Sequence, residues 1–258
     1  MPRRFKSLME ESERKRDSRI VLALDVVDED PERILLKSMS IIDRVNEYIC
    51  AIKINFHLIL PLGLFGGVRK ILERARELGL PTIADCKAND IGSTNRLIAE
   101  NYFRAGFDAL IANPFVGWED GLQPIFEVAD KMERGVILLT YMSHKASSEG
   151  YGQNVYEAIS GKIRPQYVIF AEKSLLWGAD GVIVGATYPE RIRGIYNILG
   201  DSVPIYSPGV GAQGGDIRMA VLSGSRYLIV GRSIIEADDP SKSARSIRDI
   251  VNEARKSD

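Results

Sequence analysis

The sequence contains only two histidines and two cysteines among its 258 residues. His57 and His144 are too few and too scattered to form a zinc site, and no CxxC motif is present. Two cysteines cannot make a disulfide framework. Cys50 and Cys86 both lie in apolar segments, so we interpret them as reduced packing residues of a cytoplasmic protein.

The sequence also lacks an excess of charge of either sign and lacks long apolar runs. Lys and Arg total 34 against 35 Asp and Glu, a formal net charge of −1, which excludes a global attraction to nucleic acid or to an anionic membrane. No apolar run is long enough to span a bilayer. Residues 1–18 form a charged extension without a hydrophobic core, which is not typical of a secretory signal. We expect a solvated helix there, packed loosely against the domain.

Short apolar runs alternate with longer amphipathic segments along the chain. The runs predicted to be strands are Ile20–Leu24, Cys50–Ile54, Thr82–Ala84, Ala109–Ala112, Val136–Thr140, Gly181–Val184, Val203–Tyr206 and Tyr227–Val230. The predicted helices include Pro31–Asn46, Gly67–Leu78, Ser93–Arg104, Tyr156–Trp177 and Asp216–Leu222. The first follows Asp28 and Asp30, which are good N-cap types, and Gly79 stands where a C-cap glycine is expected.

This alternation predicts parallel strands joined by right-handed crossovers. Eight such units point to a closed (β/α)₈ barrel, the TIM barrel, rather than an open sheet. No linker rich in Pro, Gly or Ser divides the chain. The prediction is therefore an α/β fold with a single barrel domain over residues 1–258, of which residues 1–18 are the short helical extension.

In such barrels the active site lies at the C-terminal ends of the strands. The polar residues at or just past those ends are Asp25, Lys53, Asp85, Lys87, Asn113, Ser143 and Gln213. On a strand, Asp85 and Lys87 would share one face while Cys86 points to the other. A structural ion pair would explain Asp85 and Lys87 taken alone. Charges on three strands that converge on one barrel mouth are more than stability requires, which favours a functional site.

Two glycine-bearing loops indicate what binds there. Ser207–Gly215 follows the seventh strand, and Gly231-Arg232-Ser233 follows the eighth, which is the recurrent phosphate site of this fold. Glycines let backbone N–H groups approach an anion, and arginine adds bidentate reach. The loop alone could be a tight βα turn, but its pairing with Arg232 favours a phosphorylated ligand. The polar segment Tyr141–Arg164 could be a slack surface loop, and we predict instead a lid over the ligand.

These motifs together resemble orotidine 5'-monophosphate decarboxylase in its compact single-domain form, from about Arg19 to the C-terminal helix. The motifs that carry the resemblance are Asp85-x-Lys87-x-x-Asp90-Ile91, Leu24-Asp25, Ile52-Lys53, Met142-Ser143-His144, Ser207-Pro208-Gly209 through Gln213, and Gly231-Arg232. Lys145 departs from the family pattern, in which proline is common after Ser-His, and this concerns only the shape of the lid.

The resemblance implies an alternating array of charges formed by Lys53, Asp85, Lys87 and Asp90. Asp90 would come from the partner subunit of a homodimer, accompanied by Thr94, which would contact the ribose. The remaining implied substrate contacts are Asp25 to the ribose hydroxyls, Ser143 to the pyrimidine edge, Gln213 between base and phosphate, Gly231 and Arg232 to the phosphate, and Pro208 in the same loop.

The implied reaction is the loss of CO2 from C6 of orotidine 5'-monophosphate, which gives UMP in pyrimidine biosynthesis without a metal or organic cofactor. Lys87 would stabilise the carbanion at C6 and then donate the proton. The nearest alternative is a metal-dependent sugar-phosphate aldolase or decarboxylase of the same superfamily, which would carry a glutamate metal ligand where this chain has Lys53. A non-catalytic nucleotide-binding barrel is the second alternative, and it would have no need of Lys87 facing Asp85.

Overall fold

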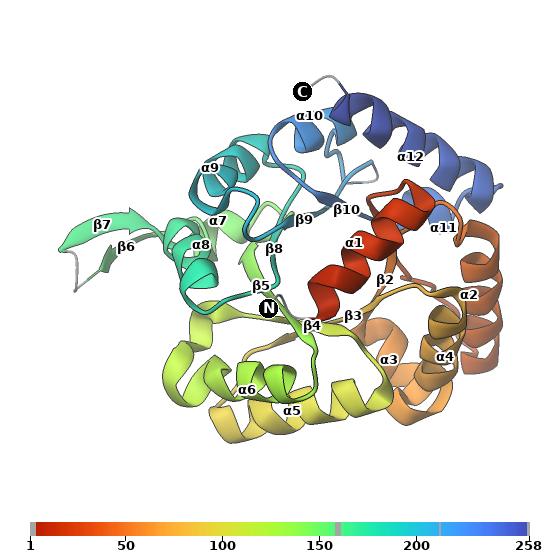
Figure 1. Ribbon diagram of the computed structural model, residues 1–258, viewed down its shortest axis with the longest axis horizontal. Helices are drawn as coiled ribbons and strands as arrows, with labels where there is room; N and C mark the ends of the chain where they lie inside the picture. The colour runs from red at the N-terminus through yellow and green to blue at the C-terminus, as the bar shows by residue number, and fades with distance from the viewer. Residues whose placement is uncertain (1–3, 158–160, 212, 257–258) are drawn as a thin grey trace.

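A computed structural model of the chain describes residues 4–157, 161–211 and 213–256. Eight parallel strands close into a barrel in the order β1-β10-β9-β8-β5-β4-β3-β2, as Figure 1 shows. The barrel strands are β1 Ile20–Ala23, β2 Ala51–Asn55, β3 Thr82–Ala88, β4 Ala109–Ala112, β5 Gly135–Tyr141, β8 Gly181–Val184, β9 Ile205–Pro208 and β10 Tyr227–Val230. The predicted TIM barrel is confirmed, and all eight predicted strands are present.

Helices cover the outside of the barrel. They are α2 Pro31–Val45, α3 Phe56–Leu62, α4 Val68–Leu78, α5 Gly92–Ala105, α6 Gln123–Lys131, α8 Gln166–Leu176, α9 Pro189–Leu199, α10 Ile217–Leu222, α11 Arg232–Ile235 and α12 Pro240–Arg255, with single turns η1 Gly63–Gly67, η2 Pro114–Val116 and η3 Trp118–Leu122. The predicted caps are confirmed, because the Asp30 side chain accepts from the Glu32 N–H at the start of α2 and Gly79 ends α4 with φ 68°. In the described part of the chain, no helix combines the length and the apolarity needed to cross a membrane.

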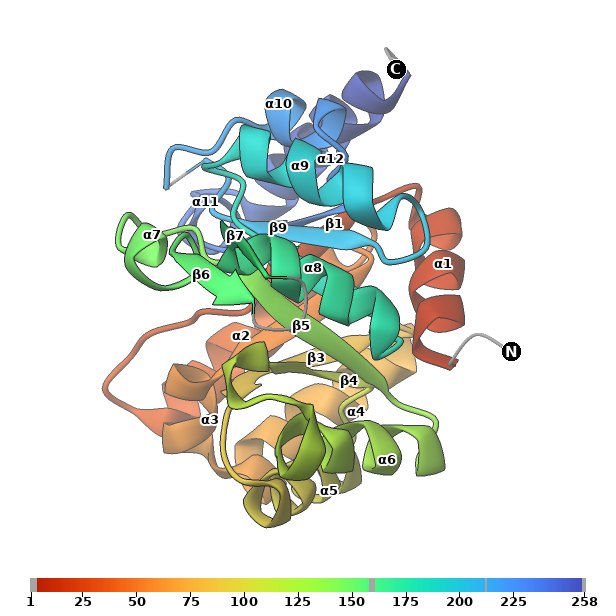
Figure 2. The same cartoon turned by 90° about the vertical axis from the view of Figure 1, so that its left-hand side faces the viewer.

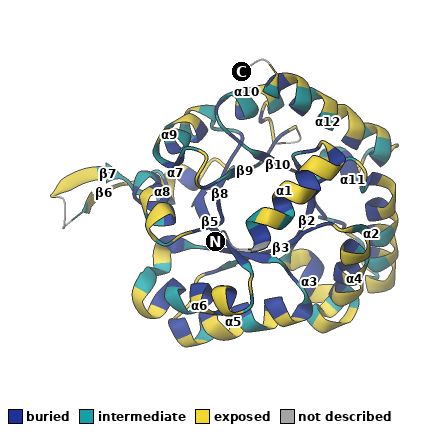
Figure 3. Cartoon of the chain, viewed as in Figure 1, coloured by how far each residue is buried: buried dark blue, intermediate teal, exposed yellow. Residues whose placement is uncertain are grey.

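The predicted helix Tyr156–Trp177 is wrong at Tyr156, Glu157 and residues 161–165, while residues 158–160 lie outside the described part of the chain. An antiparallel hairpin precedes α8, formed by β6 Asn154–Glu157 and β7 Lys162–Pro165. Gly161 has φ 66°, which breaks a helix, and Pro165 is extended and serves as the N-cap of α8. Figure 3 shows the hairpin projecting from the barrel as a largely exposed ribbon.

The N-terminal helix α1, Arg4–Arg16, is packed tightly rather than loosely. It lies across the N-terminal end of the barrel, opposite the end where α7 (Ser147–Gly150) and the hairpin lie, as Figure 2 shows. Phe5 and Met9 are 0% and 1% exposed, because their four-residue spacing places both on the helix face that meets the strands. A Cβ on Gly135, at the start of β5, would lie 2.5 Å from the Phe5 ring. The expectation of loose packing is therefore wrong.

Candidate functional site

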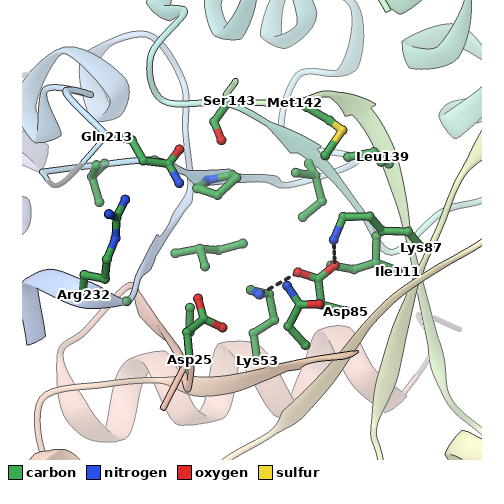
Figure 4. A pocket seen from close by; sticks show the side chains of 18 residues that line it. Asp25, Lys53, Asp85, Lys87, Ile111, Leu139, Met142, Ser143, Gln213 and Arg232 are labelled. Atoms are coloured by element: carbon green, nitrogen blue, oxygen red, sulfur yellow. Dashed lines mark hydrogen bonds and ion pairs between the residues drawn. The ribbon is translucent and has the colours of Figure 1, made fainter. Parts of the chain in front are cut away.

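A cavity of about 230 Å³ opens at the C-terminal end of the barrel. Side chains from β1, β2 and β3 line it on one side, and the loops after β5, β9 and β10 line it on the other (Figure 4). The predicted site residues that line it are Asp25, Lys53, Asp85, Lys87, Ser143, Pro208, Gln213, Gly231 and Arg232. Strand ends from distant parts of the sequence meet here, as the predicted barrel requires.

Asp85 lies between two lysines. Its Oδ2 accepts from Lys53 Nζ and its Oδ1 from Lys87 Nζ, each at 2.6 Å. The side chains of Lys53 and Asp85 are 6% and 9% exposed, whereas that of Lys87 is 31% exposed. One carboxylate thus holds two ammonium groups at the cavity wall, and Lys87 is the one within easier reach of a ligand.

Burial and charge oppose each other in this group. Burial works to raise the pKa of Asp85, but the charges of Lys53 and Lys87, with their hydrogen bonds, hold it below its usual value of 3.8. Burial likewise works to lower the pKa of Lys53, but Asp85 and Asp25 raise it above 10.5. Asp85 and Lys53 are therefore both ionised at neutral pH.

The strand carrying Asp85 and Lys87 is irregular. The register of β3 against β4 shifts between Ala84 and Ala88, and Lys87 has φ 46°, a conformation that a non-glycine residue rarely adopts. Such a bulge redirects side chains, and backbone strain of this kind is often kept at functional sites. The predicted convergence of Asp85 and Lys87 is confirmed, while Cys86 is buried and contacts the Ile111 carbonyl.

Asp25 follows β1 and lies beside the charged group. Its Oδ1 is buried and has no hydrogen-bond partner among the described residues, and the nearest base is His57, whose Nε2 lies 3.9 Å away. A buried carboxylate oxygen without a donor is costly. Asp25 Oδ1 is therefore available to accept a hydrogen bond from a hydroxyl group of a ligand in the cavity.

The far side of the cavity carries Arg232 and Gln213, as Figure 4 shows. Arg232 opens α11, is exposed and forms no ion pair with any described carboxylate. Gly209 has φ 96°, and a Cβ there would lie 2.9 Å from both Gln213 Oε1 and Ser143 Cβ. This glycine lets the loop after β9 approach Ser143, so that the end of the cavity with Arg232 and Gln213 faces the end with Lys53, Asp85 and Lys87 (Figure 4).

Sequence reasoning missed the apolar wall between these two ends. It is formed by Ile111, Leu139, Met142, Ile183, Val210 and Ile229. Ile111, Leu139, Ile183 and Ile229 are each 5% exposed or less, so they read as ordinary core residues in the sequence. Their alternation along β4, β5, β8 and β10 could have indicated which of them face the barrel interior. Asn55, also missed, lines the cavity at the end of β2.

Asp90 and Thr94 are not brought to this cavity within one chain. Asp90 is exposed in the turn before α5, and its carboxylate accepts from the Ile91 N–H. The turn is held by buried Asn95, which donates to the carbonyls of Asp90 and Gly121. Asn113 also lies outside the cavity, because it caps η2 by accepting from the Phe115 N–H.

The segment predicted to be a lid contributes Met142 and Ser143 to the cavity. Farther along, Tyr151 packs edge-on against Phe115 and near Tyr141, and Ser147 is buried. Closure over a ligand stays a prediction, and the part of the tip at residues 158–160 lies outside the described residues.

Neither thiol belongs to the site. Cys50 and Cys86 are free and buried, and burial raises the pKa of Cys86 to about 12, so that it packs as an apolar side chain. Among residues 4–157, 161–211 and 213–256, no three side chains of His, Cys, Asp or Glu gather as a metal site would require.

A family model, related sequences and solved structures all indicate the same family for this chain. The model of a family described as orotidine 5'-phosphate decarboxylase / HUMPS matches residues 18–247. A protein from Methanosarcina acetivorans named orotidine 5'-phosphate decarboxylase is 39% identical over 236 residues, which cover 92% of this chain and 96% of that protein.

Two solved structures are similar over nearly the whole chain. The crystal structure of orotidine 5'-phosphate decarboxylase from Pyrococcus horikoshii OT3 superposes with a TM-score of 0.74 and 36% identity, covering 90% of this chain and 98% of that one. The corresponding enzyme from Methanocaldococcus jannaschii, complexed with inhibitor BMP, gives a TM-score of 0.76 and 30% identity, covering 91% of this chain and 99% of that one.

Proposed function

Because the chain belongs to the orotidine 5'-phosphate decarboxylase family, it is a carboxy-lyase that converts orotidine 5'-phosphate to UMP and CO2, and we propose that the Lys53–Asp85–Lys87 array carries this reaction. The two salt bridges of 2.6 Å to Asp85 are the observation that supports this role. They fix a cation beside a carboxylate at the wall of the cavity.

In the proposed step the bond between C6 and the carboxylate carbon breaks, and its electron pair stays on C6 while CO2 leaves. Lys87 Nζ stabilises the developing charge and then transfers one proton to C6, which completes UMP. Fixed charges aimed at the position of developing charge are the strongest contribution that such a site can make. Asp85 holds Lys87 in place and is itself held by Lys53, so that little reorganisation is needed.

Most of the contacts that bind the substrate would lie at the other end of the cavity. We assign the phosphate to Gly231 and Arg232, the bridge between base and phosphate to Gln213 beside Pro208, and the pyrimidine edge to Ser143. The unsatisfied Asp25 Oδ1 suits a ribose hydroxyl. Remote contacts of this kind lower the barrier when they are used to place the reacting atom against Lys87.

We propose further that Asp90 and Thr94 complete the cavity of a second subunit in a homodimer. Exposed apolar side chains near them support this arrangement. Ile91, just before α5, is 64% exposed, Leu97 within α5 is 59% exposed, and Phe65 in neighbouring η1 is 52% exposed. Apolar side chains gathered on adjoining elements are typical of a subunit interface.

The metal-dependent alternative is disfavoured by the same salt bridge. Lys53 Nζ occupies Asp85 Oδ2 and is 6% exposed, so that a divalent cation would have to displace a buried ammonium group. We also propose that residues 1–258 act as one domain, and that the protein is cytoplasmic, in keeping with its free thiols.

The test is a single assay with two arms. The purified protein is incubated with orotidine 5'-monophosphate, and the orotate ultraviolet band is followed before and after exhaustive treatment with EDTA. We expect the band to decay at the same rate in both arms. Loss of turnover on chelation, with recovery on adding Mg²⁺, would favour the metal-dependent alternative. No decay in either arm would refute the proposed activity.

A further inference from the structure

A second cavity, of about 310 Å³, lies at the N-terminal end of the barrel, far from the site described above. Its wall contains four arginines, Arg19, Arg193, Arg226 and Arg255, and one carboxylate, Asp201. The arginines come from the chain just before β1, from α9, from the residue before β10 and from the end of α12. Figure 1 shows α9, α10 and α12 next to one another along this side of the barrel.

The positive charge of this cavity is only partly neutralised. Arg19 and Arg226 both bind Glu13, at 2.7 and 3.1 Å, and Arg255 lies 3.8 Å from the same carboxylate. Arg255 is also 3.9 Å from Asp17, whose side chain is 79% exposed. Asp201 accepts a hydrogen bond from Tyr196. Three guanidinium groups therefore share essentially one buried carboxylate, which leaves donors unused.

Arg193 adds a fourth cation without any carboxylate partner among the described residues. It donates to the Leu222 carbonyl at the end of α10. Burial, together with the like charges of Arg19 and Arg226, lowers the pKa of Arg255. Like charges gathered around a recess raise the local concentration of anions, and guanidinium forks match the geometry of phosphate oxygens.

We propose that this cavity binds a phosphate-bearing anion, held mainly by Arg193 and Arg255 and oriented by Arg19 and Arg226. The chemistry on the wall is that of a phosphate, diphosphate or nucleotide group. Such an anion would neutralise the charge shared around Glu13 and so link α1, β1, β10 and α12.

The probe is inorganic pyrophosphate, with binding measured by calorimetry at constant ionic strength. All measurements use the full chain carrying Arg232→Ala, because Arg232 gives the catalytic cavity its own affinity for phosphate groups. In this background we expect saturable binding. The double variant Arg193→Gln/Arg255→Gln should weaken it by about tenfold or more, since two charge-assisted contacts are lost and the tight Glu13 contacts remain.

The matched control is Lys15→Gln/Arg76→Gln. These two residues line a different cavity at the same end of the barrel. Like the test variant, this control removes two positive charges. We expect unchanged pyrophosphate binding. Asp201→Asn removes the wall's carboxylate and should tighten binding by about threefold, an effect of opposite sign that misfolding cannot imitate. Equal loss in both double variants, or no binding by the Arg232→Ala chain, would overturn the proposal.

Discussion

At the scale of single residues, the proposed chemistry depends on Asp85, whose two oxygens accept from two different lysines. Lys53 is buried and fixed, whereas Lys87 is partly open to the cavity. The same residue type thus serves two purposes, one as a counter-ion in the wall and the other as the proposed proton donor.

Lys87→Ala should lose nearly all turnover while still binding UMP, because the proposed base and phosphate contacts lie elsewhere. Arg232→Ala should instead raise KM strongly with a smaller loss of kcat, since it removes remote binding. Steady-state kinetics of both variants, with Lys131→Ala on the exposed end of α6 as control, test this division. Equal kcat losses in the two variants with unchanged KM would contradict it.

Asp85→Asn should lower the free energy of unfolding by about 3 kcal/mol, because it leaves two ammonium groups without their carboxylate. The pKa of Asp85 is depressed in the folded chain, so its contribution is present above its usual value of 3.8 and is lost as pH falls through the lower folded value. Lys53, with its pKa raised above 10.5, stays charged throughout this range.

The difference in stability between the native chain and Asp85→Asn should therefore be constant from about pH 5 to pH 9, and it should shrink below about pH 4. Urea unfolding at several pH values measures it. A difference that stays constant down to about pH 2 would show that the pKa of Asp85 is not lowered in the folded chain.

At the scale of elements, the loops at the barrel mouth are held in place by glycines that allow close contact. A Cβ on Gly185, just after β8, would lie 2.5 Å from Ser143 Cα, which is backbone and cannot rotate away. Gly185→Ala should therefore shift Ser143 and reduce kcat/KM by roughly tenfold or more. Gly194→Ala, within α9, meets no atom within 4 Å and should leave kcat/KM unchanged. Equal activity of the two variants would argue against a role for Ser143 in the site.

We expect the helix α1 to contribute to stability rather than to catalysis. Phe5→Ala should lower the free energy of unfolding by about 3 kcal/mol, because its ring is fully buried against Gly135. kcat should be unchanged wherever the chain is folded, since α1 lies at the opposite end of the barrel from the cavity. Ser7→Ala, at an exposed position of α1, is the control and should change stability by less than about 0.5 kcal/mol. A small effect of Phe5→Ala would restore the expectation of a loosely packed helix.

At the scale of the whole molecule, one chain leaves the proposed site incomplete, since Asp90 and Thr94 do not line its cavity. Lys87→Ala and Asp90→Ala subunits should each be inactive alone. If they exchange statistically, half of the dimers are hybrids, and each hybrid has one intact site, so that about a quarter of all sites recover.

The control mixes Lys87→Ala with Asp85→Ala, two defects that both fall in a chain's own cavity, and this mixture should stay inactive. Subunit exchange is verified by mass-labelled chains before activity is read. Recovery in the first mixture and not in the second supports the shared site. Absence of recovery after proven exchange would place Asp90 outside the active site.

Local patterns in the sequence were sufficient for the barrel. Largely apolar runs of three to five residues that alternate with amphipathic helices favour parallel strands buried on both faces, and the bounds of β4, β8 and β10 were predicted to the residue. The positions of Asp25, Lys53, Asp85 and Arg232 at the mouth follow from this topology, because C-terminal strand ends must meet.

What the sequence did not reveal depends on contacts between distant segments. The burial of Phe5 requires the start of β5, the turn at Gly161 replaces a helix that propensity favoured, and the bulge at Lys87 arises where β3 pairs with β4. The four arginines of the second cavity come from four separate segments of the chain. The periodicity of a sequence determines which face of an element is buried, but only the tertiary structure decides which residues of other elements that face meets.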